Sequence, residues 1–106
     1  MTINEYIDNT RANHESEWLK ILPKVTCKDG FEMSVQASAG HYCSPRITNA
    51  MFYDMVEVGY PSSEEPLLME YAENSSAPTD TVYGYVPYSI VDAVIEKHGG
   101  IVEVAE

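Results

Sequence analysis

The sequence predicts an α+β domain in which a small antiparallel sheet of about four to five strands is packed by an N-terminal and a C-terminal helix. Two patterns support this prediction. Short alternations of apolar and polar residues in the middle of the chain are typical of strands, and apolar residues at helical spacing occur near both ends. A chain of 106 residues can bury one hydrophobic core and is too short for two, so we expect a single domain over residues 1–106.

The first predicted helix covers residues 3–21. Thr2 and Glu5 have the spacing of a capping box, in which each side chain bonds the backbone N–H of the other residue. The middle of this segment is polar all round. Two alternatives follow: either the helix is in two pieces, or residues 1–16 are a loosely attached helix that docks through Trp18.

A β-hairpin is predicted where two alternating segments, 24–27 and 31–37, flank an Asp-Gly pair. A two-residue loop would split the apolar side chains between the two faces. A three-residue loop that ends at a left-handed Gly30 pairs Val25 with Met33 and puts the apolar side chains on one face. We therefore expect the three-residue loop.

The rest of the chain predicts a loop, three strands and a helix before a final short strand. In order, these are a loop over 39–50, a central strand over 51–60, a short strand over 67–72, a connector over 73–80, a strand over 81–86, a helix that Pro87 opens, and a last edge strand over 101–104. The helix has Ile90, Val91, Val94 and Ile95 as its buried stripe. His98 lies near that face, and Gly99 is placed to end the helix in the left-handed conformation.

Charge is the compositional outlier, with 17 Asp and Glu against 6 Lys and Arg and a net charge of −11. The imbalance lies in residues 51–106, whose sequence contains no lysine or arginine other than Lys97. Such a surface repels phosphate backbones and anionic lipids, so we expect no direct binding of nucleic acid or membrane. It attracts proteins with basic surfaces. The alternative interpretation is that the charge serves only solubility.

Cellular location and thiol state follow from what the sequence lacks. No apolar stretch approaches the roughly 20 residues that cross a bilayer, and the first residues do not resemble a signal peptide, so we expect a cytoplasmic protein. Cytosolic thiols stay reduced. For Cys27 and Cys43 we therefore favour buried free cysteines over a disulfide.

Six of the eight tyrosines fall within the acidic part of the chain. Tyrosine is enriched in binding surfaces, and strict alternation in the 81–86 strand would put Tyr83 and Tyr85 on one face. The alternative is that the tyrosines simply cover a sheet face. The candidate partner-binding residues are Tyr53, Asp54, Glu57, Tyr60, Glu64, Glu65, Glu70, Tyr71, Glu73, Tyr83 and Tyr85.

A rival candidate site is the 39–50 loop, where His41, Cys43 and Arg46 could line a ligand pocket, with Arg46 suited to a carboxylate or phosphate. Cys27, His41 and Cys43 are ligand types that zinc selects, but the chain lacks closely spaced cysteine pairs, so we expect no metal and no cofactor. No phosphate-binding glycine loop or catalytic signature is present in the sequence. We therefore expect a protein that is not an enzyme.

Six segments of the chain resemble a family of small proteins of unassigned activity encoded by tailed bacteriophages and prophages. They are Trp18–Phe31, Ser34–Ser38, His41–Arg46, Val56–Ser62, Tyr83–Pro87 and His98–Ile101. The resemblance brings no catalytic residue or cofactor. Small acidic phage proteins without enzymatic motifs often bind host proteins, including inhibitors that block the nucleic-acid channel of CRISPR or restriction nucleases with carboxylates.

This resemblance and the charge together predict a phage- or prophage-encoded, non-enzymatic inhibitor of a host defence or nucleic-acid enzyme. Its partner would be a host protein with a basic surface, and the inhibitor itself would be a monomer or homodimer. Two alternatives remain open. The first is a small-ligand or metal-binding accessory protein that uses the His41, Cys43 and Arg46 loop, and the second is a structural or assembly accessory of the virion.

Overall fold

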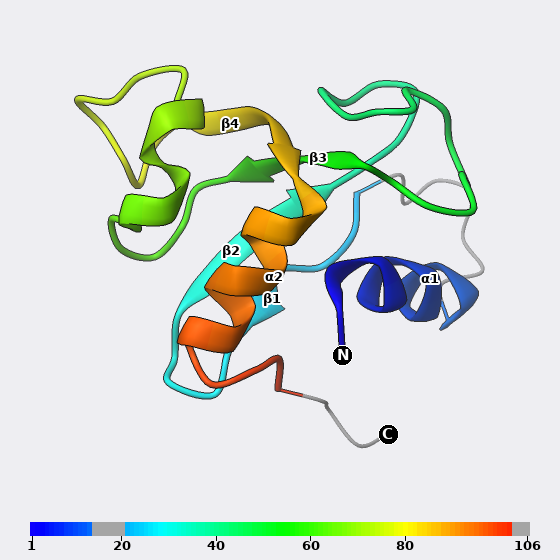
Figure 1. The fold of residues 1–106 in the computed structure, drawn as a ribbon, viewed down its shortest axis with the longest axis horizontal. Coiled ribbons are helices and arrows are strands. Elements are labelled where there is room, and N and C mark those ends of the chain that lie inside the picture. The colour runs from blue at the N-terminus through cyan, green and yellow to red at the C-terminus, as the bar shows by residue number, and fades with distance from the viewer. Residues whose placement is uncertain (14–20, 103–106) are drawn as a thin grey trace.

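The structure, a computed structural model, describes residues 1–13 and 21–102. Its elements in chain order are α1 (Ile3–Asn13), β1 (Val25–Thr26), β2 (Glu32–Gln36), β3 (Met55–Gly59), the 3-10 helix η1 (Pro66–Tyr71), β4 (Val82–Pro87) and α2 (Tyr88–Lys97). The four strands form one antiparallel sheet in the order β1-β2-β3-β4, and α1 and α2 pack together (Figure 1). The α+β architecture predicted from the sequence is confirmed.

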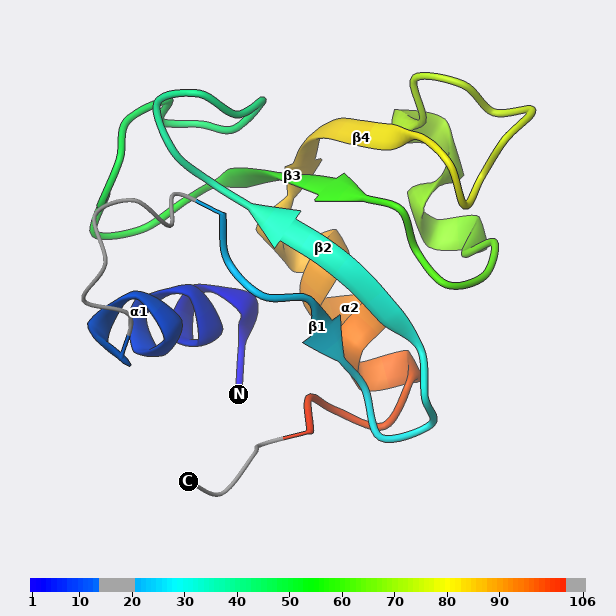
Figure 2. The same cartoon turned by 180° about the vertical axis from the view of Figure 1, so that it is seen from behind.

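Helix α2 covers one face of the sheet, as the view from behind shows (Figure 2). The strands turn alternating apolar residues toward it, including the fully buried Met33, Val35, Val56 and Val58. From the helix, the predicted stripe is buried at Val91, Val94 and Ile95, with Ile90 partly buried against the core. Each fully buried side chain of this kind contributes about 1.5–3 kcal/mol, so this interface carries much of the fold's stability.

Helix α1 attaches to the core through its own first turns. The Thr2 and Glu5 capping box forms as predicted, with reciprocal backbone-to-side-chain bonds of 2.7 and 3.3 Å. Ile3 and Ile7 are buried, and the Ile3 N–H donates to Asp92 of α2 at 2.8 Å. The described part of α1 runs to Asn13, and the rest of the helix predicted over 3–21, including the docking residue Trp18, lies in residues 14–20 outside the described part.

The hairpin has the predicted register. Val25 pairs with Met33, and the Cys27 N–H donates to the Phe31 carbonyl at 2.8 Å. Gly30 has φ +96°, in the left-handed region where glycine carries no Cβ penalty. The three-residue loop is therefore confirmed.

The central strand is shorter than predicted, since β3 begins at Met55 and not at residue 51. The backbone just before it is bonded elsewhere. The Tyr53 N–H donates to the Asn4 side chain at 2.8 Å and the Tyr53 carbonyl accepts from the same side chain at 3.1 Å, while the Asp54 N–H donates to the Ser44 carbonyl. These bonds to α1 and to the 39–50 loop keep the segment out of the sheet.

The strand predicted over 67–72 is wrong, because Pro66–Tyr71 is the 3-10 helix η1. Proline is pre-organised for the first position of a helix, and the carboxylate of the preceding Glu65 accepts the Leu67 N–H at 2.9 Å as an N-cap. Only Leu68 of this segment is fully buried. The apolar run over 67–71 therefore lies in a 3-10 helix that packs on the core through Leu68.

Strand β4 is confirmed but bulged. Val86 lies opposite Val56, while Tyr83 lies opposite Val58, so three steps on β4 match two on β3. Tyr85 has φ +53° within this bulge. Tyr83 is consequently buried and Tyr85 exposed, and the prediction that they share a face is wrong.

Beyond α2 the chain turns back to the edge of the sheet. Gly99 has φ +92°, as predicted for the residue that ends the helix. In the described part of the predicted last strand, Ile101 forms a bridge with Cys27 and the Val102 N–H donates to the Thr26 carbonyl. Residues 103–106 are outside the described part. Among the helices of residues 1–13 and 21–102, none is long and apolar enough to cross a lipid bilayer.

Candidate functional site

The connection between β3 and β4, residues 61–81, forms a lobe at one end of the sheet (Figure 1). We call it the acidic lobe. Its exposed charged side chains are Glu64, Glu70, Glu73 and Asp80, and the segment contains no lysine or arginine. Its return limb follows the outer side of β4, where Ala72 bridges Tyr83 and the Glu73 N–H donates to the Val82 carbonyl. The segment that carries these carboxylates is therefore attached to the sheet through Ala72 and Glu73.

Glu65 anchors the lobe and is not part of its surface. Its side chain is 1% exposed and accepts hydrogen bonds from three donors: the Leu67 N–H, the Lys97 ammonium at 3.0 Å and the His98 Nε2 at 2.7 Å. Burial alone would raise the pKa of Glu65, but these bonds and the charge of Lys97 lower it overall. Glu65, predicted to contact a partner, therefore has its carboxylate bonded inside the protein and away from the surface.

His98 continues this network to the opposite hairpin. Its Nδ1 lies 2.6 Å from the Asp29 carboxylate, and its ring stacks on Phe31 with 4.1 Å between centroids. Burial alone would lower the pKa of His98, but the hydrogen bonds and charges of Glu65 and Asp29 raise it. Because both ring nitrogens are taken, His98 has no free nitrogen for base catalysis or metal binding. The sequence placed this histidine near the buried face and gave no sign of its two partners.

Two predicted contact tyrosines are buried in the core. The Tyr53 hydroxyl donates to the Ile47 carbonyl at 2.7 Å and accepts from Arg11 at 3.0 Å. The Tyr83 hydroxyl donates to the Pro78 carbonyl and so ties the acidic lobe to β4. Tyr53 and Tyr83, both predicted to contact a partner, are therefore buried side chains that support the fold and do not reach the surface.

The remaining candidates differ in how far they reach the surface. Asp54, Tyr60, Glu64, Glu70, Glu73 and Tyr85 are exposed, whereas Glu57 and Tyr71 are half-buried. The Glu57 carboxylate accepts the Tyr42 N–H at 3.1 Å, which commits it partly to holding the 39–50 loop. The lobe and the exposed tyrosines thus form the part of the predicted surface that a partner can reach.

The 39–50 loop does not gather its three candidate ligand residues around one point. His41 Nδ1 lies 2.6 Å from the Ser38 hydroxyl, and the buried Cys43 thiol donates to the Ser38 carbonyl at 3.1 Å. These bonds close a local turn. Arg46 instead lies over the Tyr42 ring, with its guanidinium carbon 5.3 Å from the ring centroid. His41 and Cys43 are thus bonded to Ser38, whereas the contact given for Arg46 is with the Tyr42 ring.

The two cysteines are free and buried, as expected from the sequence. Burial raises the pKa of both thiols, which disfavours the reactive thiolate. Within the described segments, no group of three or more His, Cys, Asp or Glu side chains is placed to hold a metal ion.

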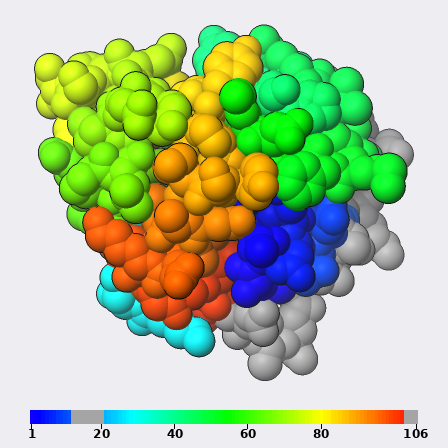
Figure 3. Space-filling model, viewed as in Figure 1, coloured from blue at the N-terminus to red at the C-terminus, as the bar shows by residue number. Residues whose placement is uncertain are grey.

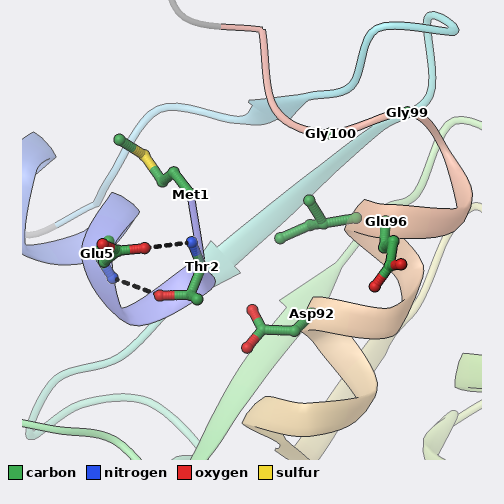
Figure 4. A pocket seen from close by; sticks show the side chains of 8 residues that line it. Met1, Thr2, Glu5, Asp92, Glu96, Gly99 and Gly100 are labelled. Atoms are coloured by element: carbon green, nitrogen blue, oxygen red, sulfur yellow. Dashed lines mark hydrogen bonds between the residues drawn. The ribbon is translucent and has the colours of Figure 1, made fainter.

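An open hollow of about 450 Å³ lies between the start of α1 and the end of α2 (Figure 4). Figure 4 shows Glu5 bonded to Thr2 on one side and Asp92 and Glu96 projecting from α2 on the other. Asp92 already accepts the Ile3 N–H. None of the residues predicted for a site lines this hollow, and its polar groups serve to cap α1 and join it to α2.

Comparisons with protein-family models, with curated proteins and with solved structures gave no match to this chain, so the functional argument rests on the geometry above.

Proposed function

We propose that this protein is a non-enzymatic, phage- or prophage-encoded inhibitor that binds a basic surface of a host defence or nucleic-acid enzyme in the bacterial cytoplasm. The observation that carries the proposal is the acidic lobe. Four carboxylates project from one ordered segment that contains no compensating lysine or arginine. Enzymes that hold nucleic acid do so with lysine and arginine, which such a lobe complements.

The structure also limits how a partner could bind. The outer side of β4 is already engaged, because Val82 accepts from Glu73 and the Tyr85 N–H donates to the Tyr42 carbonyl at 3.0 Å. At the other edge of the sheet, Thr26 and Cys27 pair with the chain beyond α2. Strand addition would have to displace these bonds, which favours recognition through side chains over main-chain pairing.

Capture of partners from bacterial lysate at low and high salt, with two charge-reversal variants, tests the proposal. The lobe variant is Glu64→Lys with Glu70→Lys. The matched control is Asp8→Lys with Glu96→Lys, which changes the net charge equally at exposed positions of α1 and α2. A captured enzyme is then purified and its affinity measured for all three proteins, together with its nucleic-acid binding when the protein is added.

The proposal predicts that the wild type and the control retain the enzyme at low salt, release it at high salt and block its nucleic-acid binding. The lobe variant should lose the enzyme even at low salt, because lysines then face the partner's basic residues. Equal capture by the wild type and both variants would show that the lobe is not the contact. A captured protein whose nucleic-acid binding is unchanged would rule out inhibition.

A further inference from the structure

A cluster of exposed aromatic and methionine side chains lies where β4 meets α2, outside the acidic lobe. Tyr42 and Tyr85 form one pair, with ring centroids 6.0 Å apart, and Phe52 and Tyr88 form another at 5.0 Å. All four side chains are more than a third exposed. We call these four residues the aromatic patch; the 95% exposed Met51 precedes Phe52 in the chain.

The backbone is built to hold this patch in place. The Tyr85 N–H bonds to the Tyr42 carbonyl at 3.0 Å, and the Tyr88 N–H bonds to the Asp54 carbonyl at 2.9 Å. Tyr85 keeps φ +53° in the β4 bulge, a left-handed conformation that is unfavourable for a bulky residue. Without the bulge, Tyr85 would share a face with the buried Tyr83. The strained conformation thus places an aromatic ring in solvent.

One half of the patch already holds a guanidinium. The Arg46 side chain lies over the Tyr42 ring at 5.3 Å, within the range of a cation–π contact. Arginine stacks on aromatic faces better than lysine because its guanidinium is planar and weakly hydrated. The chain's own Arg46 therefore shows that the Tyr42 ring accepts a guanidinium.

The negative charge of the protein limits which molecules could bind the aromatic patch. A second copy of the chain carries the same net charge of −11, and anionic lipid or nucleic acid is also repelled. Figure 3 shows the lobe and the segments that carry the patch on one face of the molecule: the end of β4 and the start of α2 lie next to the lobe, and the 40–55 segment lies on their other side. A basic protein that meets the lobe would therefore also reach the patch.

We infer that the aromatic patch binds arginine side chains of the basic partner, and that Arg46 occupies the Tyr42 ring in the free protein. This inference rests on the proposed function and refines it. The lobe attracts any basic surface, whereas the patch distinguishes arginine from lysine. Arg46 is displaced when the partner binds.

Binding of oligo-arginine and oligo-lysine peptides of equal length, measured by calorimetry at low salt, tests the inference. The patch variant is Tyr42→Leu with Tyr85→Leu, which keeps apolar bulk and removes the rings. Ile21→Ala is the control, because Ile21 is an apolar side chain that is 66% exposed and belongs to neither the acidic lobe nor the aromatic patch. Far-ultraviolet circular dichroism confirms that each variant is folded before titration.

We expect the patch variant to reduce the preference for arginine over lysine by about two- to fivefold for each stacked guanidinium, with affinity for oligo-lysine unchanged. Ile21→Ala should leave the preference as in the wild type. Arg46→Lys keeps the charge but weakens the competitor, so it should raise affinity for oligo-arginine alone. A preference that is the same in the wild type and the patch variant overturns the inference while leaving the lobe proposal intact. Binding of neither peptide by the wild type overturns both.

Discussion

Replacing Glu65 by alanine should strongly destabilise the protein, because this carboxylate accepts three hydrogen bonds at the base of the acidic lobe. The change removes the N-cap of η1, worth about 0.5–2 kcal/mol. It also leaves the N–H of His98, whose side chain is 15% exposed, without its acceptor; a bond of this charged kind is worth about 1.5–3 kcal/mol.

Lys97 limits the loss, since its side chain is 48% exposed and regains water when the pair is broken. Removing one partner of a fully buried ion pair costs about 3–5 kcal/mol, and the exposure of Lys97 puts this case at the lower end. We therefore expect Glu65→Ala to lower the free energy of unfolding by about 3 kcal/mol. For a domain of this size that is a fall in Tm of about 12–24 °C.

Urea denaturation followed by circular dichroism at pH 6, where His98 is protonated, measures this loss. Glu64→Ala is the control, since Glu64 is the exposed neighbour and its substitution should change the free energy of unfolding by no more than about 0.5 kcal/mol. A loss below about 1 kcal/mol for Glu65→Ala would refute the reasoning, because it would mean that the network does not hold the lobe.

Three further predictions concern pH, a turn and the thiols. Because folding raises the pKa of His98, the stabilisation from this residue is complete below pH 6.5 and is lost as the pH rises through the folded pKa. Folding lowers the pKa of Glu65, so its stabilisation is present above pH 4.5 and is lost as the pH falls through the folded pKa. Thermal melts should therefore show highest stability between these values, and His98→Gln should flatten the alkaline limb; an unchanged limb would contradict the assignment. Gly99→Ala should cost about 1–2 kcal/mol in urea denaturation, because φ is +92° and the new Cβ would lie 3.3 Å from Lys28, and a neutral effect would show that the helix end can rearrange. Cys27 and Cys43 should react with a thiol reagent only after unfolding in urea, and rapid reaction of the native protein would contradict their burial.

The sequence predicted correctly those features of the fold whose conformation depends on residues close together in the chain. The capping box at Thr2, the left-handed Gly30 and Gly99, and the register that pairs Val25 with Met33 all follow from a few adjacent positions. Such features depend on backbone sterics and on keeping one apolar face, and both can be recognised in the sequence.

Features that depend on distant partners could not be predicted. The bulge that separates Tyr83 from Tyr85 arises where β4 pairs with β3 and with Tyr42, and alternation alone cannot show it. Glu65 looked like one more surface acid because its partners lie more than thirty residues away. The Glu-Pro pair was the available signal, since a carboxylate directly before Pro66 is an N-cap pattern that could have identified η1.

The acidic lobe is anchored at its base and free at its tip, which has a consequence for how the protein can evolve. Glu65, Leu68 and Tyr83 hold the base by burial and hydrogen bonds, whereas Ser75, Ser76 and Thr79 at the tip are exposed. Substitutions or short insertions at an exposed loop tip cost little folding free energy. Under the proposed function, variation there would alter which protein the lobe binds while the folded scaffold stays the same, so a lineage under changing selection could exchange partners without passing through unstable intermediates.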